Sequence, residues 1–340
     1  MFASDNSSGV HPRVMEAIAR ANQGHAVSYG DDEWTQRAHE LLRAVFGDDA
    51  ASFLTFNGTG ANVLGLSAVT PPYGSIVCTD CSHVATDECG APERILGAKV
   101  SPVAGRLGKL SPDQIERVAS DIGIQHHSQP RVVSITQPTE LGTLYEIDEL
   151  REIAGVAHAA GMRVHMDGAR LANACAALDA EPRALTADAG VDVLSFGLTK
   201  DGAMGAEAVI AFDAEIAHDL AYQRKQQMQL ASKMRFLAAQ FVAMLEDDLW
   251  LRNADTANRM AKRLADGAAS IDRVTSVYPV QANAVFAAVP QEVIGALQER
   301  QYFYVWEPDR PTVRWMASFD TTETVVDDFV EAIRKEVDAL

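Results

Sequence analysis

The regular alternation of apolar runs with amphipathic segments constrains the fold of this chain more than any other feature. Between about residues 50 and 212, short runs rich in Val, Ile, Leu and Ala are followed by segments with helical spacing. Apolar strands that alternate with helices predict an α/β fold with a mostly parallel central sheet covered by helices on both faces. We expect strands at 75–79, 98–102, 131–136, 163–167, 192–196 and 207–212, with helices at 86–96, 112–120, 147–160 and 169–177.

The pattern changes after residue 212. A helical stretch at about 214–249 is followed by another helix, by strand-like runs and by a last helix. This order predicts a smaller C-terminal α+β domain. We therefore expect an N-terminal segment, residues 1–30, that packs on the small domain or on a partner subunit. A large domain with the binding site would span residues 31–249, and the small domain residues 250–340.

The composition excludes several classes of protein. The chain has 340 residues, of which 47% are apolar, so it can bury a full core. Its net charge of -18 disfavours nucleic acids and anionic membranes as partners. No uninterrupted apolar run is long enough for a transmembrane helix, and the N-terminus lacks a basic region followed by an apolar run. We expect a cytoplasmic protein.

Four cysteines are too few for a disulfide framework in a chain of this length, so we expect a reducing compartment. Cys78, Cys81 and Cys89 lie close together in the sequence, and with His83 they resemble part of a zinc site. However, residues 75–79 have the pattern of a buried strand, and no second paired motif follows. We predict thiols in a core strand and the next loop, without a metal. A zinc-binding protein is the alternative from a different class.

One lysine and one aspartate follow consecutive predicted strands. Lys200 comes after an apolar run in a turn rich in small residues, where desolvation would lower its pKa and favour the neutral nucleophile. Asp167 ends the strand at 163–167, a position where an aspartate is often only a helix cap. A lysine that forms a Schiff base and an acid that pairs with a pyridine nitrogen are what pyridoxal 5'-phosphate (PLP) needs most from a protein. The two residues therefore predict a PLP site.

Further motifs fall at the carboxyl ends of predicted strands, where ligands usually bind in such sheets. The turn NGTGAN at 57–62 joins a strand to a helix, and its free N–H groups favour a phosphate. His83 is either a satisfied polar group or a residue that stacks on a cofactor ring and moves protons. Arg170 and Arg314 are candidate clamps for a carboxylate. The histidine pair at 126–127 lies in a polar loop.

The order of these motifs resembles that of the low-specificity L-threonine aldolases, which belong to the β-eliminating lyase group of fold-type I PLP-dependent enzymes. The resemblance covers essentially the whole chain, and its most specific part is HMDGAR at 165–170 followed by the lysine. It implies the fold-type I, PLP-dependent transferase-like fold. The matching segments are Ser4-Asp5, YGDD at 29–32, NGTGAN at 57–62, Ser82-His83, HMDGAR at 165–170, Thr199-Lys200 and Arg314.

The resemblance implies which residues hold the cofactor. Lys200 would carry PLP as a Schiff base, and Asp167 would pair with the pyridine nitrogen. His83 would stack on the ring, while Gly58 and Thr59 would bind the phosphate. Arg170, three residues after the aspartate, would also lie at the cofactor.

It also implies how the substrate is bound. Ser4, Arg170 and Arg314 would hold the substrate carboxylate. Tyr29 would line the site and reach it from a neighbouring subunit. The basic residues of the long helical stretch would include one that reaches a neighbour's phosphate; the candidates are Arg224, Lys225 and Lys233.

The chain departs from the commoner form of the family at several points, among them Asp201, where that form has a glycine after the lysine. The expected activity is that of an aldehyde-lyase, which cleaves L-threonine, L-allo-threonine or a related β-hydroxy-α-amino acid to glycine and an aldehyde. His83 or His126 is the candidate base for the β-hydroxyl proton. The resemblance implies a homodimer or homotetramer with shared active sites. The alternatives are a phenylserine-type aldolase and a PLP-dependent β-eliminating lyase that acts on another amino acid.

Overall fold

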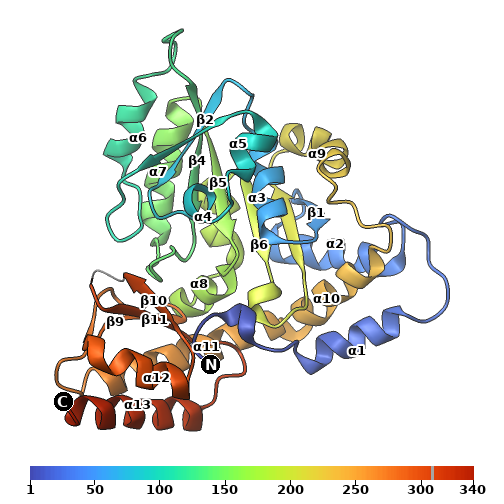
Figure 1. The fold of residues 1–340 in the computed structure, drawn as a ribbon. Helices are drawn as coiled ribbons and strands as arrows, with labels where there is room; N and C mark the ends of the chain where they lie inside the picture. The colour runs from blue at the N-terminus through green and yellow to red at the C-terminus, as the bar shows by residue number, and fades with distance from the viewer. Residues whose placement is uncertain (308–309) are drawn as a thin grey trace.

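The computed structural model describes residues 1–307 and 310–340. In this part of the chain, seven strands form a large sheet and four strands form a second, smaller sheet (Figure 1). The strand order of the large sheet is β1–β7–β6–β5–β4–β2–β3. Its strands are β1 (Ala51–Thr55), β2 (Gly74–Thr79), β3 (Lys99–Val103), β4 (Gln129–Thr136), β5 (Arg163–Gly168), β6 (Val193–Gly197) and β7 (Glu207–Ala211).

The large sheet confirms the predicted α/β fold. Strands β2 to β6 pair in parallel, close to the expected bounds. The last strand, β7, differs because it runs antiparallel to both β6 and β1. Only residues 198–206 connect β6 to β7, and this loop is too short for the crossover that a parallel strand requires. The alternation of strands and helices did not reveal this reversal.

Helices cover both faces of the large sheet (Figure 1). One face is covered by α3 (Gly58–Ser67), α5 (Ala91–Leu96) and α9 (Ala214–Gln226). The other face carries the larger hydrophobic core and is covered by α2 (Glu33–Phe46), α6 (Pro112–Ala119), α7 (Ile147–Ala159), α8 (Leu171–Leu178) and α10 (Arg235–Leu245), with α1 (Pro12–Ala21) against α10. No helix within the described residues is both long enough and apolar enough to span a membrane.

The helix expected at 86–96 is broken into two. Its first part, α4 (His83–Thr86), ends before Cys89 and Gly90, whose φ angles are 51° and 71°. Such left-handed backbone cannot continue a right-handed helix, so α5 starts afresh after it. In the same way, the helical stretch expected at 214–249 is interrupted, and residues 227–234 separate α9 from α10.

A second hydrophobic core lies between the small antiparallel sheet and three helices. Phe2 is fully buried in this core, and its backbone bonds to Tyr302 and Met316, each at 2.9 Å. Helix α11 links the two cores, with Trp250 in the large one and Leu264 in the small one. We keep the boundaries 1–30, 31–249 and 250–340 as a proposal. The elements of this region are β8 (Thr275–Ser276), β9 (Ala284–Ala288), β10 (Tyr304–Glu307), β11 (Thr312–Met316), α11 (Leu249–Ala268), α12 (Ile294–Arg300) and α13 (Glu323–Asp338).

Candidate active site

A pocket of about 390 Å³ opens beside the carboxyl ends of β5 and β6 and the N-terminus of α3. Helix α3 lies alongside β6 at this point (Figure 1). The pocket wall brings together five residues that the sequence singled out, which are Lys200, Asp167, His83, Gly58 and Thr59. Their convergence in one cavity is a property of the strand order, because the carboxyl ends of parallel strands meet at one edge of the sheet.

Lys200 lies in a short 3₁₀ turn, Thr199–Asp201, that follows β6. The threonine Oγ1 of this turn accepts a hydrogen bond from the N–H of Ala206 at 3.1 Å, which closes the loop. Gly202 ends the turn with a φ of 114°, a backbone conformation that favours glycine. Burial lowers the pKa of Lys200, and the positive charge of Arg170 lowers it further. A lowered pKa makes the neutral, nucleophilic amine more available at neutral pH.

Asp167 lines the pocket near the end of β5 and is 4% exposed. One carboxylate oxygen accepts from Asn62 Nδ2 at 2.8 Å, and the other accepts from the N–H of Ala169 at 3.0 Å. Burial alone would raise the pKa of Asp167, but the charge of Lys200 and these two hydrogen bonds lower it. The carboxylate is therefore ionised at neutral pH and can pair with a cation. It does not act as the N-cap of α8, since that position belongs to Arg170.

The N-terminus of α3 faces the same pocket. Asn57 caps the helix by accepting from the N–H of Gly60 at 2.7 Å. The N–H groups of Gly58 and Thr59 have no acceptor among the described residues. Two free N–H groups and the positive end of the helix dipole fit a phosphate. A Cβ at Gly60 would lie 2.5 Å from the amide end of the Gln229 side chain, so a larger residue at this position would displace that side chain.

His83 begins α4 and is held by two carboxylates. Its Nδ1 lies 2.8 Å from Glu88 Oε1, and its backbone N–H donates to Glu140 Oε1 at 2.8 Å. The hydrogen bond to Glu88 raises the pKa of His83, and burial opposes this shift. Asn62 donates to both Glu88 and Asp167. Sequence reasoning missed both glutamates and Asn62 as site residues, although Asn62 ends the phosphate-type turn.

Arg170 and Arg314 lie next to the N-terminal segment. Arg170 forms a bidentate ion pair with Asp5, with Nε–Oδ2 at 2.6 Å and Nη2–Oδ1 at 3.0 Å. Arg314 donates from Nη2 to the carbonyl oxygen of Ala3 at 3.1 Å, and its Nε is buried without a partner among the described residues. Ser4 lies between these contacts and caps the turn that follows it. The three predicted carboxylate-binding residues therefore gather in one place, together with an aspartate that was not assigned a role.

Two further carboxyl groups lie close to Lys200. Glu207 begins β7, lines the pocket and is 6% exposed. Burial raises its pKa to about 7, although a hydrogen bond from Thr199 and the charge of Lys200 oppose the shift. Asp201 is also buried, and burial raises its pKa well above the ordinary value. A charged residue at the first position of an otherwise apolar run was the signal that could have identified Glu207.

The structure does not bring His126 or Tyr29 to the pocket. His126 is exposed in the loop between α6 and β4. This loop enters β4 at its amino end, so it lies at the opposite edge of the sheet from the pocket (Figure 1). We therefore correct the assignment of His126 as a candidate base. Tyr29 is 49% exposed, and its ring centroid lies 5.3 Å from Lys225 Nζ. A role for Tyr29 in a neighbouring subunit stays a prediction.

The geometry does not favour the zinc alternative. Cys78 lies within β2, and burial raises the pKa of its thiol to about 11. A metal ligand must be deprotonated, which this environment opposes. In the part of the chain that the structure describes, no three His, Cys, Asp or Glu side chains are arranged to hold a metal ion.

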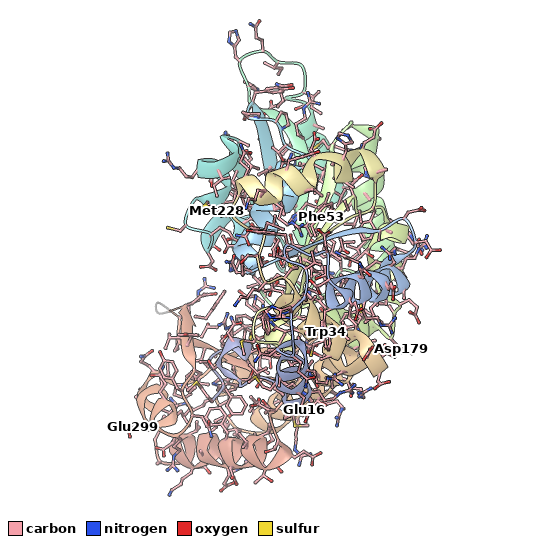
Figure 2. All side chains as sticks on the ribbon, turned by 90° about the vertical axis from the view of Figure 1, so that its right-hand side faces the viewer. Glu16, Trp34, Phe53, Asp179, Met228 and Glu299 are labelled. Atoms are coloured by element: carbon pink, nitrogen blue, oxygen red, sulfur yellow. The ribbon has the colours of Figure 1, made fainter. Side chains whose placement is uncertain are left out.

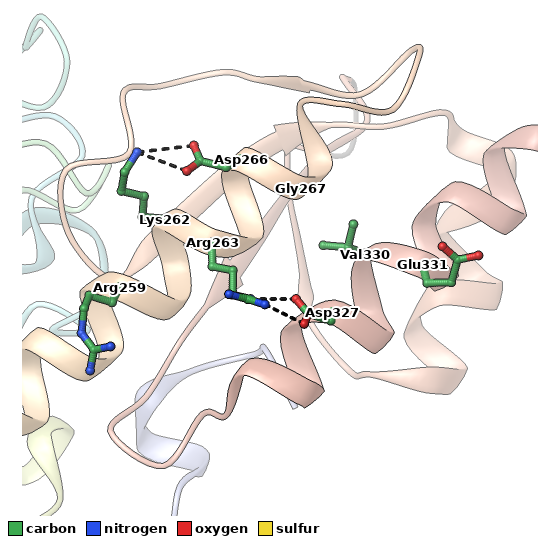
Figure 3. A pocket seen from close by; sticks show the side chains of 8 residues that line it. All are labelled: Arg259, Lys262, Arg263, Asp266, Gly267, Asp327, Val330 and Glu331. Atoms are coloured by element: carbon green, nitrogen blue, oxygen red, sulfur yellow. Dashed lines mark hydrogen bonds and ion pairs between the residues drawn. The ribbon is translucent and has the colours of Figure 1, made fainter.

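A further cavity, of about 550 Å³, lies between α11 and α13 in the small domain (Figure 3). Its charged side chains form ion pairs, some with one another and some with neighbouring residues. Arg263 binds Asp327 with two contacts of 2.7 Å, and Lys262 approaches Asp266 at 3.2 Å. Both pairs are exposed, and such pairs are common on protein surfaces, so we assign this groove no ligand.

Comparison with known proteins was consistent across sequence and structure. The family model described as Beta-eliminating lyase matches residues 1–292. The chain is 45% identical to the "Low specificity L-threonine aldolase" of Pseudomonas aeruginosa, over 98% of this chain and 96% of that protein. It is 44% identical to the enzyme of the same name from Pseudomonas sp., over 99% of this chain and 98% of the relative. The structure of Leishmania major threonine aldolase superposes with a TM-score of 0.93 at 28% identity and covers 99% of each chain.

Proposed function

This chain belongs to the beta-eliminating lyase family, and we propose that it acts as a low-specificity threonine aldolase. It would cleave L-threonine, L-allo-threonine or a related β-hydroxy-α-amino acid to glycine and an aldehyde. Two relatives that share this name match nearly the whole chain at 44% and 45% identity. The observation that carries the proposal is the single pocket into which Lys200, Asp167 and the N-terminus of α3 all face.

The pocket residues fit PLP. Two N–H groups without an acceptor at Gly58 and Thr59 suit the phosphate of the cofactor. The ionised carboxylate of Asp167 suits a protonated pyridine nitrogen. The amine of Lys200, with its lowered pKa, suits attachment to the cofactor aldehyde, and His83 borders the same space.

When bound, PLP supplies an electron sink for the electron pair that is released as the Cα–Cβ bond of the substrate breaks. The chain itself orients the substrate and moves its protons. Arg314, whose Nε has no partner among the described residues, would bind the substrate carboxylate together with the Nη1 of Arg170, since the other two nitrogens of Arg170 bind Asp5. These contacts would hold the breaking bond in one orientation. His83 accepts the proton of the β-hydroxyl at Nε2, because its Nδ1 is occupied by Glu88. The hydroxyl carbon then leaves as the aldehyde, and Cα gains a proton to become glycine.

The test is product analysis on the PLP-loaded protein with a panel of β-hydroxy amino acids. We expect glycine and acetaldehyde from L-threonine in equal amounts. Pyruvate and ammonia from serine, without aldehyde from threonine, would identify a β-eliminating lyase instead. Replacing Lys200 with alanine should abolish the absorbance of lysine-bound PLP. The matched variant Lys262→Ala, at an exposed position far from the pocket, should retain it.

We also infer that the active unit is a homodimer or homotetramer. Apolar side chains are exposed around the mouth of the pocket, with Phe56 45% and Met204 53% exposed. Met228, in the loop after α9, is 79% exposed and projects outward from the molecule (Figure 2). Exposed apolar side chains of this kind suit an interface between subunits.

Sedimentation velocity tests this inference, and a monomer at micromolar concentration would contradict it. If Tyr29 completes a neighbour's site, mixing the inactive variants Tyr29→Ala and Lys200→Ala should restore part of the activity. Location in the cytoplasm also remains a proposal, which cell fractionation would test.

A further inference from the structure

Glu88 is an ionisable side chain that is fully buried beside the pocket, and the mechanism above gives it no step of its own. Its side chain has no exposed surface. It follows α4 and comes directly before Cys89 and Gly90, whose left-handed backbone turns the chain toward α5. A buried carboxylate is costly unless other groups satisfy it, so its partners indicate what it does.

The two groups that contact Glu88 Oε1 must be hydrogen-bond donors, whereas Oε2 is buried without a partner among the described residues. Its Oε1 lies 2.8 Å from His83 Nδ1 and 2.9 Å from Asn62 Nδ2. Asn62 Nδ2 also lies 2.8 Å from Asp167 Oδ2. The contact with Glu88 places a proton on His83 Nδ1, because an ionised carboxylate only accepts hydrogen bonds. The remaining nitrogen, Nε2, is then the basic atom of the neutral ring.

We propose that Glu88 is a positioning residue that fixes the Nδ1–H form of His83 and stabilises the ring when Nε2 takes up a proton. Asn62 donates hydrogen bonds to both Glu88 and Asp167. One hydrogen-bonded chain therefore links His83, which accepts the proton, to Asp167, which would pair with the pyridine nitrogen of PLP. A carboxylate that orients a histidine in this way is a recurrent device for proton transfer. The reaction that this arrangement serves rests on the proposed function.

The charges around His83 support this role. Glu88 and Asp167 face the ring as carboxylates and raise its pKa, whereas burial and the positive charge of Lys200 lower it. Glu140 contacts the backbone N–H of His83 and not the ring. Glu88 makes the largest contribution, and its own pKa is lowered because the hydrogen bonds that it accepts outweigh the effect of burial.

The variant Glu88→Gln tests the proposal, because glutamine keeps the acceptor oxygen and removes the charge. The pH dependence of His83 modification by diethyl pyrocarbonate would be followed by peptide mass spectrometry on the apoprotein. We expect the midpoint for His83 to move to lower pH in Glu88→Gln. It should stay unchanged in the matched control Asp87→Asn, where the neighbouring carboxylate is exposed. An unchanged midpoint in Glu88→Gln would overturn the proposal.

Two further measurements keep the test decisive. If Glu88→Gln does not fold, the wild-type protein suffices: a midpoint for His83 above that of the exposed His25 supports the role of Glu88, and equal midpoints contradict it. In the PLP-loaded enzyme, we expect kcat at pH 7 to fall about 10-fold or more in Glu88→Gln with little change in KM. The modification experiment uses no substrate, so its result does not depend on whether the protein cleaves threonine. It can therefore refute the role of Glu88 even when threonine cleavage is demonstrated. A protein that does not cleave β-hydroxy amino acids would refute only the proposed function.

Discussion

Replacing Asp5 with asparagine should destabilise the protein by about 3 kcal/mol, because the change breaks a buried ion pair from one side. Asp5 is 1% exposed and binds Arg170 through two contacts of 2.6 and 3.0 Å. Asp5 also accepts a hydrogen bond from Asn283 Nδ2 at 3.1 Å. Through Arg170 and Asn283 it joins the N-terminal segment to the large and the small domain. Removing one partner of a buried pair costs about 3–5 kcal/mol, and we expect the lower end because asparagine keeps one acceptor oxygen.

The exposed pair between Arg263 and Asp327 provides a matched comparison (Figure 3). It has the same bidentate geometry, with two contacts of 2.7 Å, but its two side chains are exposed to solvent. Thermal and urea unfolding of Asp5→Asn and Asp327→Asn would be followed by circular dichroism at equal protein concentration. A loss of about 3 kcal/mol corresponds to a fall in Tm of about 4 °C for Asp5→Asn, with almost none for Asp327→Asn. Equal losses for the two variants would refute the argument from burial.

The pH dependence gives the same prediction a second test. Burial alone would raise the pKa of Asp5, but the charge and hydrogen bonds of Arg170 lower it below the ordinary value of 3.8. A carboxylate with a lowered folded-state pKa contributes its full stability above the unfolded pKa and loses it as the pH falls through the folded pKa. The difference in the free energy of unfolding between wild type and Asp5→Asn should therefore stay constant from about pH 8 to about pH 5. It should become smaller only in more acidic solution.

Four further predictions follow from single positions. Because the pKa of Glu207 is raised to about 7, its carboxyl gains a negative charge above that pH, beside the turn at 57–62 where we propose that the phosphate of PLP binds. The affinity of the apoprotein for PLP, measured by fluorescence titration, should fall as the pH rises through 7, and Glu207→Gln should remove this dependence. Gly190→Ala should cost about 3 kcal/mol in urea unfolding, since φ is 93° and the new Cβ would meet Ala154 Cβ at 2.6 Å. Gly155→Ala, in α7 with open space around it, should stabilise the protein by up to about 1 kcal/mol. His126→Asn should leave kcat and KM within about two-fold of wild type, because surface changes away from the site have small effects; a ten-fold loss would contradict our correction.

Hydrophobic periodicity was sufficient to predict most of the fold. Strands buried on both faces become continuous apolar runs, and β2 to β6 were found close to their observed bounds for this reason. The same runs placed Lys200 and Asp167 at strand ends, where the parallel topology brings them to one pocket. The motif at 57–62 was equally informative, because a capping residue and free N–H groups are local properties of a helix start.

Hydrophobic periodicity and local motifs could not predict the contacts between distant parts of the chain. The partners of Arg170 and His83 are Asp5 and Glu88. Asp5 lies in a segment that matches the family, but it was assigned no role, and no motif marked Glu88. His126 was a wrong candidate for a different reason. It precedes the strand expected at 131–136, and in a parallel sheet the amino ends of the strands lie at the edge opposite the site.

The linear order of residues therefore determined which side chains are buried and which strand ends carry reactive groups. The reason is that apolar residues recur along the chain with the period of the helix or strand that buries them. Tertiary structure alone decided which buried charges meet, how β7 runs and which nitrogen of His83 is free. The reason is physical: a buried ionisable group must be satisfied by whatever donor or charge the packing brings within about 3 Å. That partner can lie anywhere in the sequence.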